Sequence, residues 1–220
     1  MSQRAAPVLE WLSALAVVMA GGVLCGGPLD AHAEPDPEPA QRWFGLGTKQ
    51  ASFSVGYGLG VRPSVLSDRD ELEELRDVSI VELIPRFGIG LTPPLGGDAW
   101  YRGNAELLLE GAFLFNLEPR SGWAAGGGLS LRYNFTAGRR IVPFVEGNVG
   151  ALYLDFDLLS QSDGFNFNLG LGTGLHWFVR DRVALTPGVR WQHISNAGTS
   201  QPNRGINAIL FLLGASVFWD

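Results

Sequence analysis

The chain contains very little cysteine, lysine or methionine. Its single cysteine, Cys25, lies in an apolar stretch near the N-terminus, and the rest of the chain has none. A framework of disulfides is therefore excluded, and stability must come from packing and hydrogen bonding. After residue 33 there is also no run of about 20 apolar residues. The remainder of the chain thus offers no candidate for a membrane-spanning helix.

Residues 1–33 have the order of parts found in a secretory signal peptide. Arg4 provides a positive start, the stretch WLSALAVVMAGGVLCGG is apolar, and AHA is a small-x-small cleavage site. The alternative is an N-terminal membrane helix, but the Gly- and Pro-rich residues that follow are more typical of a processing site. We predict a signal peptide over 1–33 and one domain over 34–220.

The charge balance is acidic. The chain has 16 Lys plus Arg against 22 Asp plus Glu, a formal net charge of −6. A nucleic-acid partner would require a basic face, so this class is not expected. The sequence also shows no cluster with metal-ligand spacing and no phosphate-binding glycine loop, so we predict neither a metal nor a cofactor.

Eight segments alternate between apolar residues and small or polar ones, the period of a β-strand. The clearest is 165–177, where Phe, Leu and Trp alternate with Asn, Gly and His176. One face of each segment is apolar, with aromatic residues near the ends. Together with 30 glycines and 11% aromatic residues, the pattern predicts an all-β fold. The other seven segments lie at 51–61, 81–91, 102–115, 123–135, 141–154, 183–192 and 207–219.

The second face of these segments carries acids and arginines in equal number among many glycines. A face turned to water would be richer in lysine and poorer in glycine. Balanced charges instead suit the packed interior of a narrow closed barrel, where they pair to offset desolvation. We expect a salt-bridge ladder inside, and a hydrogen-bonded lumen position for His176. The charged residues are Glu82, Arg86, Arg102, Glu106, Glu110, Arg132, Glu146 and Arg190.

The connections between the segments favour a membrane barrel. Long connections at 62–77, 155–164 and 196–205 fall on one side, and short ones at 136–140 and 180–182 fall on the other. Short turns inside and long loops outside are typical of outer-membrane barrels, which close without an edge. We predict an eight-stranded antiparallel transmembrane β-barrel in the Gram-negative outer membrane. Eight strands leave no aqueous pore, and a soluble lipocalin-like barrel is the alternative.

A histidine and a serine continue the apolar face of segment 183–192. By parity His193 and Ser195 both point outward, toward lipid, at the outer-leaflet end of their strand. Their Cα atoms are expected about 6.6 Å apart, so the imidazole and the hydroxyl can meet. A Ser–His pair is the smallest unit for nucleophilic acyl transfer. The alternative without catalysis is that both are amphipathic residues at the hydrated membrane interface.

The motif HISNAG, followed by QPNRGIN, resembles the active-site segment of the lipid A 3-O-deacylase family. The resemblance implies an esterase that removes the 3-linked acyl chain of lipid A, with lipopolysaccharide as substrate. It implies His193 as general base and Ser195 as nucleophile, with Asn196 and Gly198 as oxyanion donors. Where that family has an acidic residue to orient the histidine, this chain has Asn207, which parity also turns outward.

Other interpretations remain open at this point. Asn203 either contacts the substrate or shapes the PNRG turn. The neutral Asn207 either supports the histidine through its carbonyl oxygen or marks a chain that has lost activity. The competing function is a structural or adhesion barrel without chemistry, and a weaker one is acyl transfer to another acceptor. The sequence leaves the oligomeric state open, and a homodimer is one possible assembly.

Overall fold

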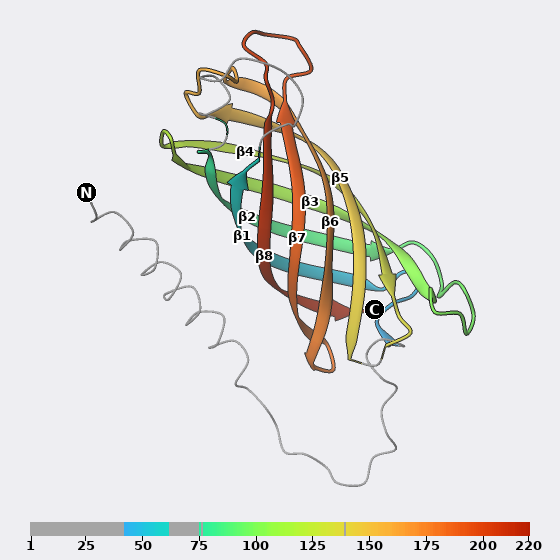
Figure 1. Cartoon of the computed structure of the whole chain (residues 1–220). Coiled ribbons are helices and arrows are strands. Elements are labelled where there is room, and N and C mark those ends of the chain that lie inside the picture. Colours follow the sequence, from blue (N-terminus) through green and yellow to red (C-terminus); the bar gives the residue numbers. More distant parts are fainter. Residues whose placement is uncertain (1–41, 62–74, 76, 139) are drawn as a thin grey trace. The chain divides into compact units, whose positions relative to one another are not determined.

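Eight antiparallel strands close into a barrel in which each strand pairs with its neighbours in the chain and β1 pairs with β8 (Figure 1). The computed structural model describes residues 42–61, 75, 77–138 and 140–220. The predicted signal peptide and most of the 62–77 connection lie outside the described residues. The strands are β1 (Lys49–Gly60), β2 (Ser79–Gly90), β3 (Gly103–Glu118), β4 (Gly122–Phe135), β5 (Ile141–Asp155), β6 (Gly164–Arg180), β7 (Val183–Ser195) and β8 (Ile206–Trp219).

The period-two pattern puts the apolar residues on the outside of the barrel. Leu171 and Leu213 expose 65% and 61% of their surface, although neither lies in a loop. Large apolar side chains are exposed on all eight strands, which suits hydrocarbon rather than water as the surrounding medium. In the described part of the chain, no helix is long and apolar enough to cross a membrane.

Ionic side chains fill the middle of the barrel interior and pair with one another. Arg190 lies 2.7 Å from oxygens of both Glu110 and Glu146, and Arg86 lies 2.7 Å from Glu110. Arg132 lies 2.8 Å from Glu146. We call these five residues the lumen ion network. All five are buried, and the network confirms the expected salt-bridge ladder.

Three of the residues predicted to face the interior differ in their surroundings. Arg102 precedes β3 in the β2–β3 connection and is not buried, so the prediction that it lies on the interior face was wrong. Glu82 is fully buried, but neither of its carboxylate oxygens has a hydrogen-bond partner among the described residues, contrary to the expected pairing. His176 is buried between Thr186 and Arg132, in the lumen position that parity predicted.

Each end of the lumen is closed by apolar residues, which strand alternation alone does not predict. At one end Trp43 and Phe44, which precede β1, pack with Phe178 and Phe218. At the other end Phe156 and eleven further buried residues form a second cluster. The second cluster contains Ile194 and Ile206, the inward neighbours of the predicted site. Buried apolar side chains inside the barrel therefore pack directly behind the predicted site.

The β5–β6 loop (156–163) and the β7–β8 loop (196–205) meet at one end of the barrel (Figure 1). Gln161 and Asn203 form an isolated antiparallel bridge between them. Two backbone hydrogen bonds flank it, from Ser162 N to Pro202 O at 2.8 Å and from Arg204 N to Ser160 O at 3.0 Å. The loop that follows β7 is thus held by a neighbour more than 30 residues earlier in the chain.

Candidate active site

His193 and Ser195 lie on the outward face of β7, at the C-terminal end of the strand, as parity predicts. Both are partly exposed, whereas Ile194 between them is buried. His193 Nε2 is 3.0 Å from Ser195 Oγ. The imidazole is therefore outside the lumen, and the two groups are in hydrogen-bond contact.

Asn207 on β8 completes a row of three side chains. It pairs with His193 in the β7–β8 register, and its Oδ1 lies 3.0 Å from His193 Nδ1. A carboxamide oxygen can only accept, so Nδ1 carries the proton and donates it to Asn207. In the neutral ring Nε2 is then unprotonated and accepts the hydrogen bond from the Ser195 hydroxyl. This is the tautomer that a general base requires.

Gly205 provides the space that the histidine ring occupies. It ends the β7–β8 loop with φ +74°, and a methyl group there would lie 2.7 Å from His193 Cε1. Real Cβ contacts do not come so close, and L side chains rarely adopt this φ. Glycine is required at this position for both reasons. Gly205 lies within the QPNRGIN motif, but the sequence alone did not indicate this role.

Trp191 lies next to the histidine on the same outward face. The two rings are nearly parallel, with an interplanar angle of 15° and centroids 6.1 Å apart. On the other side of β7, Phe167 and Leu169 of β6 pair in register with Ser195 and His193. All three apolar side chains are exposed, so the site lies at the edge of the apolar belt.

The side chain of Asn196 stabilises the β7–β8 loop and its contact with the β5–β6 loop. Asn196 is buried; its Nδ2 donates to Ser162 Oγ at 2.7 Å and to Ser200 Oγ at 2.9 Å, and its Oδ1 accepts from Gly198 N at 2.9 Å. The amide and the N–H expected as oxyanion donors are thus both engaged within the loops. Among the described residues, Asn203 keeps its Nδ2 unengaged, while its Oδ1 accepts from Asn196 N at 3.0 Å.

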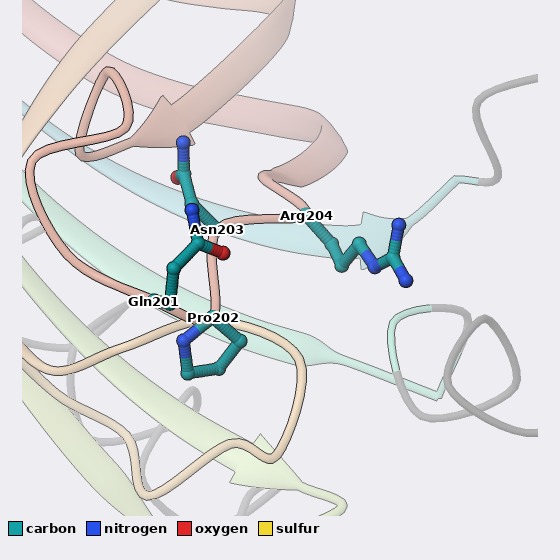
Figure 2. Close-up of a pocket in the computed structure, with 4 residues that line it drawn as sticks. All are labelled: Gln201, Pro202, Asn203 and Arg204. Carbon is teal, nitrogen blue, oxygen red and sulfur yellow. The ribbon is translucent and has the colours of Figure 1, made fainter.

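A cavity of about 510 Å³ lies in the β7–β8 loop and is lined by Gln201, Pro202, Asn203 and Arg204 (Figure 2). The Arg204 side chain extends away from the other three. Asn203 connects the cavity to the site, because its Oδ1 holds the N–H of the residue that follows Ser195. Within the described residues, no group of His, Cys, Asp and Glu has the arrangement of a metal site.

Comparison with known protein families identifies a family that fits most of the barrel. The chain fits the family described as lipid A 3-O-deacylase (PagL) over residues 85–216, more than half of its length. The chain belongs to this family. The matched range runs from β2 to β8 and includes the three residues of the row, so the resemblance seen in the motif extends over most of the barrel. No curated protein matches the chain.

Solved structures support the PagL-family fold. The crystal structure of the outer-membrane enzyme PagL is 20% identical, covers 75% of this chain and 97% of its own, and has a TM-score of 0.50. The N-terminal β-barrel domain of Pseudomonas aeruginosa OprF is 13% identical, with coverages of 80% and 99% and a TM-score of 0.50. These likenesses show the fold alone.

The family and the fold together place the chain in the outer membrane of Gram-negative bacteria. The predicted transmembrane barrel is confirmed, and the lipocalin-like alternative is wrong, because the apolar surface faces outward over the whole barrel. None of these comparisons supports a homodimer.

Proposed function

We propose that the chain is a serine esterase that hydrolyses the 3-O-linked acyl chain of lipid A. One observation carries this proposal: His193 Nε2 lies 3.0 Å from Ser195 Oγ on the lipid-facing surface of a PagL-family barrel. A Ser–His pair in an aqueous loop would suit many esters. A pair at the edge of the apolar belt suits an ester whose acyl chains lie in the bilayer.

The reaction follows from the hydrogen bonds. His193 takes the proton of Ser195, and Oγ attacks the carbonyl carbon of the ester. The tetrahedral intermediate collapses as the carbon–oxygen bond to the sugar breaks, and His193 returns the proton to the departing sugar hydroxyl. Water then attacks the acyl-serine with His193 as base. The products are the 3-hydroxyl of lipid A and a free fatty acid, and Ser195 is restored.

Asn207 orients the base in this scheme. Its Oδ1 holds the Nδ1–H of His193, so Nε2 faces Ser195. It provides no negative charge for the imidazolium that forms during the reaction. We therefore expect a working but slowed enzyme rather than an inactive one.

The developing oxyanion requires a hydrogen-bond donor. Asn196 Nδ2 and the Gly198 N–H would fill the role predicted from the motif only after the loop opens, since both are engaged. We assign the donor role in the resting arrangement to Asn203 Nδ2. The acyl chain would lie along the outward-facing apolar side chains of β6, β7 and β8, namely the exposed Phe167, Leu169, Trp191 and Phe211 and the partly exposed Ile209.

The test is the mass of lipid A from a Gram-negative host that lacks such an enzyme. Expression of the chain should remove one hydroxyacyl chain from lipid A and release it as the free acid. Ser195→Ala should abolish the change, whereas Ser121→Ala, at an exposed serine in the β3–β4 connection, should not. Identical lipid A from wild type and Ser195→Ala would leave the chain a barrel without this chemistry, and an acyl conjugate in place of the free acid would indicate transfer to another acceptor.

A further inference from the structure

Gln161 is buried and lies in the β5–β6 loop, distant in sequence from the proposed catalytic residues. Its side chain has no exposed surface, which is unusual for a glutamine in a connecting loop. Nothing in the motif of β7 and β8 points to this residue. Its hydrogen bonds nevertheless lead to the site along two separate routes.

The first route runs through the carbonyl oxygen of the Gln161 side chain. Oε1 accepts the backbone N–H of Gly205 at 2.8 Å. Gly205 is the residue whose missing side chain leaves room for the ring of His193. The hydrogen bond therefore fixes the stretch of backbone against which the base is placed.

The second route runs through the amide nitrogen. Gln161 Nε2 donates to Asn203 Oδ1 at 3.2 Å and to Asn166 Oδ1 at 2.9 Å. The same Asn203 oxygen accepts the N–H of Asn196, which directly follows Ser195. The amide thus holds the loop at the nucleophile as well as at the base. Both ends of the amide are used, so its orientation is defined.

We propose that Gln161 is a positioning residue that sets the distance between Ser195 and His193 from outside the motif. The inference rests on the proposed function. A polar side chain with all its partners satisfied in a buried site rigidifies its surroundings, and a shift of about 1 Å in a reacting group can cost about 100-fold in rate. Gln161 contacts neither reacting group, so it acts through Gly205 and Asn203.

The test compares Gln161→Ala with Asp163→Ala. Asp163 lies in the same loop, where its Oδ1 accepts the N–H groups of Phe156 and Asp157; within the described residues, no hydrogen bond joins it to the β7–β8 loop. Two rates are measured in detergent: turnover of lipid A, and labelling of Ser195 by a small fluorophosphonate. The second rate reports the alignment of nucleophile and base without the lipid.

Gln161→Ala should lower kcat and the labelling rate together by about 10- to 100-fold, with KM changed less than about twofold. Asp163→Ala should leave the labelling rate close to that of wild type. Gln161→Glu keeps the acceptor for Gly205 but replaces the donor to Asn203, so it should lie between wild type and Gln161→Ala. Heat-modifiable migration in gels verifies that each variant is a folded barrel.

The outcomes separate the two proposals. An active, labelled wild type with Gln161→Ala at the same rates would overturn the role of Gln161 alone, as would an equal loss in Asp163→Ala. An increase in KM with kcat and the labelling rate unchanged would also overturn it, because that result would indicate a role in substrate binding. A wild type that is neither labelled nor active would overturn the proposed function, and the role of Gln161 with it.

Discussion

His193 and Asn207 face each other across β7 and β8, with Nδ1 and Oδ1 3.0 Å apart. The contact fixes the imidazole tautomer by a neutral acceptor. A carboxylate in the same place would hold the same proton and would in addition stabilise the imidazolium. The chain therefore separates two contributions, orientation and charge, that an acidic partner provides together.

Substitution of Asn207 measures each contribution. Asn207→Asp keeps the side-chain length and adds the charge; a hydrogen bond to a charged group is stronger by about 1 kcal/mol, so kcat should rise about fivefold. Asn207→Leu removes the acceptor and should lower kcat by at least about tenfold, because the ring loses its preferred tautomer. The measurement is kcat on purified lipid A. Wild-type turnover in Asn207→Leu would mean that the amide does not orient His193.

Gly205→Ala tests the close approach of the loop backbone to the base. The methyl group would lie 2.7 Å from His193 Cε1, so the ring must move and kcat should fall by about 100-fold. The control is Gly47→Ala, because Gly47 has a similar φ of +81° with nothing within 4 Å of the added methyl. Both variants should lose about 1–2 kcal/mol of stability from backbone strain, but only Gly205→Ala should lose activity. Similar activity losses in both would contradict the contact.

Asn203→Asp tests the proposed oxyanion donor. The substitution keeps the Oδ1 that accepts from Asn196 and Gln161 but replaces the Nδ2 donor with a second oxygen. Loss of one such donor costs about 100- to 1000-fold in kcat, and KM should change little. Gln201→Glu adds the same charge to the same cavity without removing that donor, so it should retain most of the activity. Comparable losses in the two variants would indicate a charge effect and exclude the donor role.

Strand parity predicted the parts of the site that lie on strands. A period of two fixes which side of the barrel wall a residue occupies, so the sequence alone predicts that His193, Ser195 and Asn207 point outward. The pairing of interior charges followed from the same rule, because buried ions in a narrow lumen need opposite charges to offset their desolvation. Glu82 is the exception, since its neighbours in the lumen ion network are already engaged with other acids.

The parts of the site that lie on loops were not predictable in the same way. A loop has no period, and its conformation depends on contacts distant in sequence. Gln161 and Gly205 are 44 residues apart and meet only because β5–β6 and β7–β8 emerge at the same end of the barrel. The same reason explains Asn196: its amide could be recognised as a donor, but its partners Ser162 and Ser200 could not.

Arg190 should be essential for stability, because it pairs closely with both central acids of the lumen ion network, whereas Arg86 lies 2.7 Å from Glu110 but 3.4 Å from Glu146. Arg190 lies 2.7 Å from oxygens of Glu110 and Glu146 and has no exposed side-chain surface. Arg190→Met leaves these acids with less compensating charge, which typically costs about 3–5 kcal/mol for a buried pair. The loss is measured as the change in the free energy of unfolding in urea, with the barrel in lipid vesicles.

The matched control for Arg190 is Arg120→Met. Arg120 pairs with Asp157 at 3.4 Å, but its side chain is 39% exposed, so the loss should stay below about 1 kcal/mol. Adding Glu110→Gln to Arg190→Met should recover part of the stability, since the uncompensated charge is then removed. If Arg190→Met unfolds at the same urea concentration as Arg120→Met, the buried pairs do not stabilise the barrel.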